Sequence, residues 1–253
     1  MLRLTEVSAG YDGGFVVSGI SLNLDSGAAI IGPNGCGKTT LLKAIAGILP
    51  HKGEIAVCGR PVSKMKRREA ASRLAMLSQQ PGAYFGYSAR DTVMMGRYLR
   101  IKGRGGLAGL PSKADNEAVD GAMRRLGLSG ESGRPVTKLS GGQLQRVFLA
   151  QAIVQEPDVI LLDEPTNHLD LACQVQLIDY LKEWALEGDR LVVGVLHDIN
   201  LAMRLSHRLV VMQGGAVRAD GGGGEIIASG VLDEVYGMDV AAYMRGALGK
   251  WRE

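Results

Sequence analysis

The segment best suited to chemistry is a glycine-rich octapeptide that fits the pattern G-x-x-x-x-G-K-[ST]. Its residues are Gly32, Pro33, Asn34, Gly35, Cys36, Gly37, Lys38 and Thr39. Glycines let a backbone curl until successive N–H groups converge on phosphate oxygens, and a lysine adds a positive charge for the β- and γ-phosphates. The hydroxyl of Thr39 suits Mg²⁺, and we expect Thr40, the next residue, to contact the nucleotide as well. The octapeptide, called the phosphate loop below, predicts a site for nucleotide phosphates with Mg²⁺.

Two neighbouring acids end an apolar stretch later in the chain. Val159–Leu162 is a run of strand length, and Asp163 and Glu164 follow it directly. Two acids after a strand more often form a solvated turn, but a carboxylate at such a position also holds Mg²⁺ in enzymes with a phosphate loop. With the phosphate loop upstream, we assign Asp163 to the metal. We assign Glu164 to the attacking water, which it would orient and deprotonate.

A second segment suited to an anion consists of five residues before a helical pattern. It is called the signature segment below, and its residues are Leu139, Ser140, Gly141, Gly142 and Gln143. Serine is a favoured helix N-cap, and glycines leave backbone N–H groups exposed. A bare Ser-Gly-Gly before a helix would usually be a cap and nothing more. The full pentapeptide is more specific, because it matches the signature motif of ATP-binding-cassette (ABC) transporters letter for letter.

The chain resembles the nucleotide-binding subunits of ABC transporters over nearly its whole length. The resemblance implies a head-to-tail dimer of two copies, in which the phosphate loop of one copy and the signature segment of the other enclose one ATP with Mg²⁺. It further implies ATP hydrolysis coupled to membrane permease subunits, with an extracytoplasmic substrate-binding protein as an indirect partner. The chain itself is then expected at the cytoplasmic face of the cell membrane.

The same resemblance assigns roles to residues outside these segments. Tyr11 looks like the aromatic residue that stacks on adenine. Gln79 looks like the glutamine that contacts Mg²⁺ and water, with Gln80 as the competing choice. Asp170 resembles the aspartate that reaches across the dimer, and His197 the switch histidine that contacts the γ-phosphate. The residues expected in catalysis are therefore Glu164, His197, Gln79 and Lys38, and those expected at the metal are Thr39, Gln79 and Asp163.

One position departs from the family pattern, since Cys36 stands where the family more often has serine. This position mainly offers its backbone N–H to the phosphates. ATP binding should therefore survive the change, and every expected catalytic position is filled. We expect an active enzyme.

Strand and helix patterns indicate how these segments are positioned. Residues 2–7 and 15–24 alternate apolar and polar, which predicts edge strands. Continuous apolar runs predict strands covered on both faces; they are Ala28–Ile31, Val159–Leu162, Leu191–Leu196 and Leu209–Met212. After the phosphate loop, a helix is predicted from apolar residues at helical spacing: Leu41, Ala44, Ile45 and Ile48.

Alternating strands and helices predict an α/β fold with a parallel-sheet core. The resemblance makes it a P-loop NTPase fold with a mixed or parallel sheet, an antiparallel β subdomain and an inserted helical subdomain. The whole chain, 1–253, is expected to be a single nucleotide-binding domain. Its core is expected at about 1–81 and 156–253 and its helical subdomain at about 82–155, where the pattern is mostly helical.

Composition excludes several function classes. The net charge is +3 and the pI about 8.8, too mild to indicate nucleic acid as a partner. One basic cluster, residues 64–68 with Arg73, is interpreted as a solvated face. The three cysteines lack the spacing of a metal site or disulfide framework, which suits a reducing compartment. No secretory signal is recognised, and no apolar run has the length of about 20 residues that a bilayer requires.

Two other classes compete with a transporter subunit. The first is a soluble ABC ATPase that acts on DNA or the ribosome. DNA-repair members carry a long coiled coil between the two motifs, and ribosome-acting members usually hold two cassettes, whereas this chain has neither feature. A generic P-loop kinase would not need the signature segment.

Within transporters, three segments resemble importers of iron chelates, haem and cobalamin: Thr92–Tyr98, His197–Ala202 and Glu234–Gly237. An importer of a metal ion or an oxyanion is the alternative. Residues 82–98 are interpreted as the surface that receives the permease. The aromatic residues there either face the permease or pack inside the helical subdomain; they are Tyr84, Phe85 and Tyr87.

Overall fold

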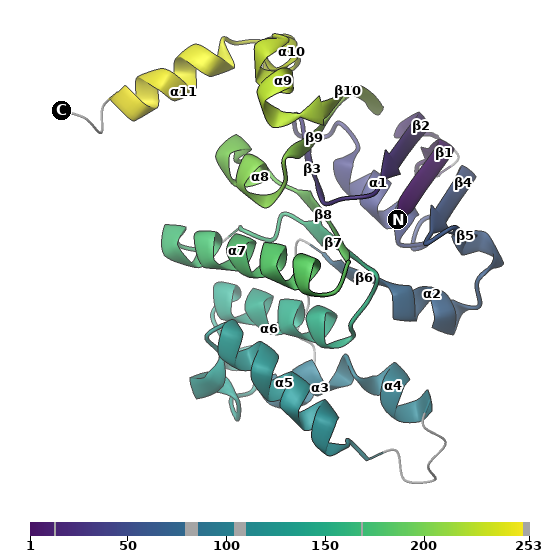
Figure 1. Ribbon diagram of the computed structural model, residues 1–253, viewed down its shortest axis with the longest axis vertical. Helices are drawn as coiled ribbons and strands as arrows, with labels where there is room; N and C mark the ends of the chain where they lie inside the picture. The colour runs from purple at the N-terminus through teal and green to yellow at the C-terminus, as the bar shows by residue number, and fades with distance from the viewer. Residues whose placement is uncertain (13, 79–85, 104–109, 168, 250–253) are drawn as a thin grey trace.

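A computed structural model describes residues 1–12, 14–78, 86–103, 110–167 and 169–249. A six-stranded sheet in the order β10-β9-β3-β8-β7-β6 runs through the middle of the molecule (Figure 1). Neighbouring strands are parallel except for β10, which is antiparallel to β9. The strands are β3 (Ala28–Ile31), β6 (Leu74–Leu77), β7 (Val159–Asp163), β8 (Leu191–Val195), β9 (Arg208–Gln213) and β10 (Ala216–Gly222). The predicted α/β class is confirmed.

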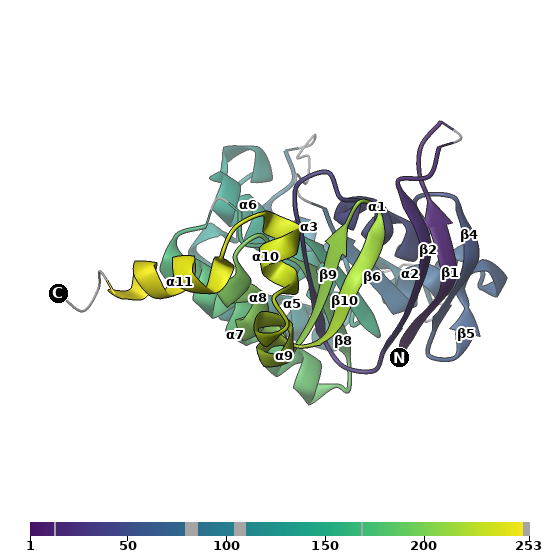
Figure 2. The ribbon, with the colours of Figure 1, turned by 90° about the horizontal axis from the view of Figure 1, so that it is seen from above.

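A second, antiparallel sheet in the order β2-β1-β4-β5 stands beside the first (Figure 2). Its strands are β1 (Leu2–Ala9), β2 (Val17–Leu24), β4 (His51–Val57) and β5 (Arg60–Pro61). In β2, buried and exposed residues alternate at Ile20, Leu22 and Leu24, as expected for a strand with one face toward a core. The sequence pattern began at residue 15, but the strand begins at Val17. Phe15 and Val16 are exposed instead.

Strand β3 shows why the phosphate loop is firmly supported. All four residues of β3 are buried, and they alternate between two hydrophobic cores. Ala28 and Ile30 pack with helix α1 (Lys38–Ile45), whereas Ala29 and Ile31 face the cluster built by the helices on the other side. A strand covered on both faces has little freedom to shift, so its carboxyl end holds a fixed position.

Most of the helices lie on the opposite face of the large sheet from α1 (Figure 1). Between β6 and β7 the helices are α3 (Ala89–Met95), α4 (Tyr98–Gly103), α5 (Lys113–Arg125) and α6 (Gly141–Val154). They are followed by α7 (Leu171–Glu187), α8 (Ile199–Leu205), α9 (Gly223–Ala228), α10 (Val231–Tyr236) and α11 (Val240–Gly249). Helix α2 (Arg67–Arg73) precedes β6, and short 3₁₀ segments lie at Val62–Lys64, Ser129–Glu131 and Val136–Lys138.

Helix α1 is shorter than the sequence pattern predicted. Helix α1 ends at Ile45, so Ile48, which fitted the helical spacing, is 64% exposed. Gly47 has φ 69°, a left-handed conformation that ends the helix before Ile48 can join its apolar face.

None of the helices in the described ranges combines the length and apolar character needed to cross a bilayer.

Candidate active site

The phosphate loop connects the carboxyl end of β3 to the first turn of α1, as its sequence pattern predicted. Two glycines are required by this geometry. Gly32 has φ 148°, and a Cβ there would lie 2.1 Å from the Met212 carbonyl oxygen. Gly37 has φ 100°, and its Cβ would lie 2.6 Å from Val17 Cγ1. Only glycine fits either position, and the result is a loop whose backbone can cradle phosphate oxygens.

Lys38 lies within the loop rather than in solvent. Its Nζ donates to the carbonyl oxygens of Gly32 at 2.7 Å and Pro33 at 2.8 Å, and its side chain is almost fully buried. The Cys36 thiol is also buried, 3.9 Å from the same Nζ. A cation held among loop carbonyls is positioned for an incoming phosphate, to which it can transfer these hydrogen bonds.

Thr39 and Asp163 are brought together from positions far apart in the chain. Thr39 Oγ1 donates to Asp163 Oδ1 at 3.0 Å, which joins the start of α1 to the end of β7. A hydroxyl and a carboxylate are hard oxygen ligands, the type that Mg²⁺ prefers, and they stand beside a phosphate cradle. The donor set therefore fits Mg²⁺. Burial raises the pKa of the Asp163 carboxyl above its ordinary value, and the neighbouring Glu164 raises it further.

This raised pKa predicts an effect of Asp163→Asn on stability without metal. Because the folded state binds the Asp163 proton more tightly than the unfolded state, ionisation of Asp163 disfavours folding at neutral pH. We expect Asp163→Asn to raise the free energy of unfolding in EDTA, more at pH 7 than under acid conditions. Urea unfolding at several pH values measures this difference. Mg²⁺ should stabilise the parent protein and not the variant; an equal Mg²⁺ effect on both would contradict the metal assignment.

The Glu164 carboxylate is held from two sides. His197 Nε2 lies 2.5 Å from Oε1, and Asn167 Nδ2 donates to Oε2 at 2.5 Å. The backbone of Glu164 has φ 53°, and its carbonyl accepts a hydrogen bond from the buried Gln145 Nε2 at 3.2 Å. A left-handed residue outside glycine is uncommon, and here it turns the acid away from the strand direction. These contacts hold the Glu164 carboxylate in one orientation.

The sequence prediction placed Glu164 and His197 in one site, and the structure brings them into contact. It did not foresee the contacts of Gln145 and Asn167. Gln145 gave a weak signal, since it is a polar residue among apolar neighbours in α6 and is only 4% exposed. Asn167 stood in the loop after the acids but had no assigned partner.

The signature segment begins α6 and is capped by its own side chains. Ser140 Oγ accepts a hydrogen bond from Gln143 N at 3.3 Å, and Gln143 Oε1 accepts one from Ser140 N at 3.0 Å. This is a capping box, which leaves the serine hydroxyl and the helix N-terminus at the surface. Among the residues that the structure describes, no hydrogen bond or ion pair joins this segment to the phosphate loop of the same chain.

The structure places two further predicted residues, Asp170 and Tyr11. Asp170 caps α7 by accepting a hydrogen bond from Cys173 N at 2.8 Å, which lowers the pKa of its exposed carboxyl. Tyr11 is 46% exposed, and Lys43 Nζ lies 3.4 Å from its hydroxyl. Gln79 and Gln80 lie outside the described residues.

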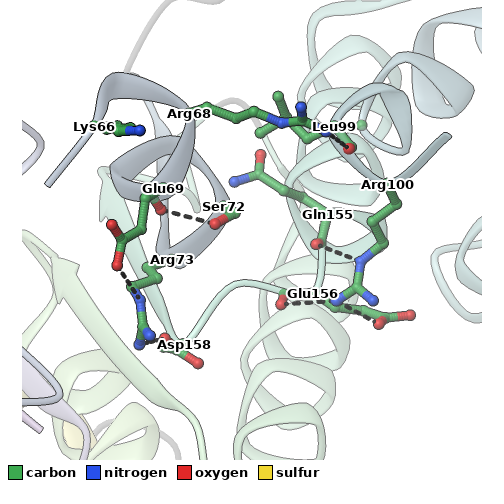
Figure 3. A pocket seen from close by; sticks show the side chains of 11 residues that line it. Lys66, Arg68, Glu69, Ser72, Arg73, Leu99, Arg100, Gln155, Glu156 and Asp158 are labelled. Atoms are coloured by element: carbon green, nitrogen blue, oxygen red, sulfur yellow. Dashed lines mark hydrogen bonds and ion pairs between the residues drawn. The ribbon is translucent and has the colours of Figure 1, made fainter. Parts of the chain in front are cut away.

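A groove of about 560 Å³ separates α2 from α4 and the end of α6 (Figure 3). Figure 3 shows Arg68 of α2 reaching toward Leu99 of α4, whose carbonyl accepts its hydrogen bond at 3.0 Å. Lys66, Arg68 and Arg73, which belong to the basic cluster that was interpreted from sequence as a solvated face, line this groove. Tyr87, which lies near the start of α3, is 51% exposed, whereas Tyr84 and Phe85 lie outside the described residues.

In the groove, every carboxylate forms an ion pair but, within the described ranges, two of the basic side chains do not. The three carboxylates are Glu69, Glu156 and Asp158, and each forms an ion pair with an arginine. Lys66 and Arg68 form no ion pair with any residue in the described part of the chain. The groove therefore presents unpaired positive charge.

Comparison with known proteins agrees with this geometry. The family model described as ABC transporter matches residues 17–167. The probable siderophore transport system ATP-binding protein of Bacillus subtilis is 38% identical over 236 residues, covering 92% of this chain and 84% of that protein. The hemin import ATP-binding protein of Streptomyces coelicolor is 38% identical over 231 residues, covering 90% and 80%.

A solved structure extends the agreement to the fold. The cbiO1 subunit of Clostridium perfringens, part of the ABC transporter complex cbiONQ, is 29% identical, with a TM-score of 0.76 over 90% of each chain. The P-loop NTPase fold predicted from the phosphate loop and signature segment is confirmed, as is the predicted family. The chain belongs to the ABC transporter family and is one of its ATP-binding, ATP-hydrolysing subunits.

Proposed function

We propose that two copies of this chain close head to tail around two MgATP and power a membrane permease that imports an iron–siderophore complex, haem or cobalamin. The observation that supports the dimer is that the phosphate loop and the signature segment, the two anion sites of one chain, are not joined to each other. Lys38 and Thr39 of the phosphate loop lie with Asp163, whereas no hydrogen bond or ion pair joins Ser140 to any of these three residues within one chain. A second copy supplies the missing serine.

In this proposal, each side chain has a task set by its position. Lys38 and the loop N–H groups bind the phosphates, and the partner's signature segment closes over the same ATP. Thr39, Asp163 and Gln79 would hold Mg²⁺, which neutralises phosphate charge when bound. Glu164 accepts the proton of the attacking water, and His197 keeps its carboxylate oriented.

Adenine would stack on Tyr11, and Asp170 would meet the partner across the dimer. Lys43 supports the tyrosine, because its Nζ lies 5.9 Å from the centre of the Tyr11 ring as well as near its hydroxyl. The proposed division is a core at about 1–81 and 156–253 with a helical subdomain at about 82–155.

The α2–α4 groove is the proposed docking site of the permease. It lies between the sheet core and the helices inserted after β6, where a partner could sense movement of one against the other. The unpaired cations Lys66 and Arg68 would suit a permease segment that carries an acidic side chain. The chain would then work at the cytoplasmic face of the membrane, with an extracytoplasmic binding protein delivering the cargo.

The substrate class rests on the relatives, whose names refer to siderophore and hemin import. A subunit that acts on the permease alone need not contact the cargo. An importer of a metal ion or an oxyanion is the nearest alternative. A soluble ABC ATPase that acts on nucleic acid or the ribosome is a second one, and it would not need the cationic groove to meet a membrane protein.

Affinity purification of Glu164→Gln from native membranes with MgATP tests this proposal. We expect a polytopic membrane protein to co-purify, and its type to narrow the substrate. The Arg68→Glu change in the same background should reduce recovery of that protein, because it reverses a charge in the groove. The matched control is Arg218→Glu, an arginine of β10 outside the groove. Recovery of only ribosomal or nucleic-acid-bound partners would exclude the transport proposal and leave the ATPase standing.

A further inference from the structure

The capping box that presents Ser140 is itself held by an acid outside the signature segment. Gln143 uses its Oε1 to accept from Ser140 N, and its Nε2 donates to Glu131 Oε1 at 3.0 Å. Glu131 ends the 3₁₀ segment Ser129–Glu131, between α5 and α6. It is therefore placed to decide which way the Gln143 amide faces.

The direction of that amide matters because its two ends have opposite hydrogen-bonding character. With the oxygen toward Ser140, the backbone N–H of Ser140 is satisfied and the capping box is complete. If the amide turned over, its NH₂ would face the Ser140 N–H, two donors would meet and the cap would be lost. The Glu131 carboxylate accepts only, so it selects the orientation that completes the cap.

An arginine holds Glu131 in turn and balances its charge. Arg134 Nη1 lies 2.6 Å from Glu131 Oε2, and Arg134 Nη2 donates to the Lys138 carbonyl at 3.0 Å. The hydrogen bonds thus form a chain from Lys138 through Arg134, Glu131 and Gln143 to Ser140. A negative charge near an anion site would oppose binding, but the paired arginine offsets it.

We propose that Glu131 is a positioning residue for the composite ATP site: it fixes the Gln143 amide so that Ser140 is preorganised for the γ-phosphate bound by the partner subunit. This inference rests on the proposed head-to-tail dimer. Preorganised donors are effective because they need no rearrangement when charge arrives. Glu131 acts only in the dimer, since the phosphate loop that it serves belongs to the other copy.

The test separates monomer binding from dimer closure. In a Glu164→Gln background, we expect Glu131→Ala to leave MgATP affinity of the monomer unchanged. It should raise the ATP concentration needed for dimerisation by about 10- to 30-fold, because a hydrogen bond to a charged group is lost. Glu131→Gln retains an acceptor for Gln143 but also brings an NH₂ group that could face a turned-over amide, so its midpoint should lie between those of the parent and of Glu131→Ala. Glu117→Ala, which removes an exposed acid of α5, is the matched control and should change neither quantity.

Size-exclusion chromatography and fluorescent-ATP binding give the two readouts. Unchanged dimerisation of Glu131→Ala, or a Glu131→Gln variant as impaired as the alanine variant, would overturn the inference. Ser140→Ala distinguishes this failure from failure of the proposed function. If Ser140→Ala weakens dimerisation and Glu131→Ala does not, only the role of Glu131 is wrong. If Ser140→Ala dimerises like its parent, the composite site is wrong and the Glu131 inference is overturned with it.

Discussion

Glu164→Gln is expected to bind MgATP and form a stable dimer while losing hydrolysis by about 10²- to 10⁴-fold, the range that a general base contributes. The substitution preserves the size of the side chain and its contact with Asn167, but removes the negative charge that accepts a proton. In the structure this carboxylate is held at 2.5 Å from both His197 Nε2 and Asn167 Nδ2. It is therefore already oriented before ATP arrives.

Phosphate release under saturating MgATP measures the loss, and size-exclusion chromatography measures the trapped dimer. Lys38→Ala is the contrasting variant, because it should weaken ATP binding itself and form no dimer. His197→Ala should bind MgATP and lose less hydrolysis than Glu164→Gln, since it removes only one of the two groups that orient the acid. Hydrolysis by Glu164→Gln at the parent rate would show that another group is the base.

The sequence predicted the site best where chemistry restricts residue type. The phosphate loop requires glycine at positions that a Cβ would obstruct, and both Gly32 and Gly37 prove to be such positions. Strands such as Ala28–Ile31 were also predictable, because a strand covered on both faces must be apolar throughout. The roles of the remaining residues, such as Tyr11 and His197, came from the family resemblance.

Contacts that support the site were not predictable, because polar residues have many alternative partners. Nothing in the sequence pairs Gln145 with the Glu164 carbonyl or Glu131 with Gln143, although each pair lies within 3.2 Å in the fold. The end of α1 was misjudged for a related reason. Ile48 continued the helical spacing, but the left-handed Gly47 ended the helix first, and periodicity does not register backbone conformation.

Helix α6 links several of these features. Ser140 stands at its N-terminus, Gln145 supports Glu164 from its second turn, and Glu156 lies in the groove just beyond its C-terminus. Docking at the groove and closure around ATP thus involve opposite ends of one helix. The residue that fixes the groove end is Arg97, whose Nη1 donates to the Val154 carbonyl at 2.8 Å.

Arg97→Met is therefore expected to have the largest effect on stability, about 3 to 5 kcal/mol of the free energy of unfolding. The arginine side chain is 4% exposed and its partner Asp115 is fully buried, with Nε and Oδ1 2.9 Å apart. Removing the guanidinium leaves the Asp115 charge buried without that partner and the Val154 carbonyl, at the end of α6, without that donor. Urea unfolding measures the loss. The control is Glu156→Gln, which removes the charge of the exposed partner of Arg97 at the groove surface and should lower the free energy of unfolding only slightly.

The double variant Arg97→Met/Asp115→Asn separates charge burial from packing. Asparagine removes the buried charge and can still accept hydrogen bonds from Ser112, whose N and Oγ now bond Asp115 Oδ2 at 2.9 and 2.6 Å. If uncompensated charge dominates, the double variant will be more stable than Arg97→Met alone. Arg97 forms no hydrogen bond or ion pair with the ATP-site residues that lie in the described ranges, so the folded fraction should keep its basal ATPase rate. A loss below about 1 kcal/mol would place this pair with surface ion pairs, in spite of its burial.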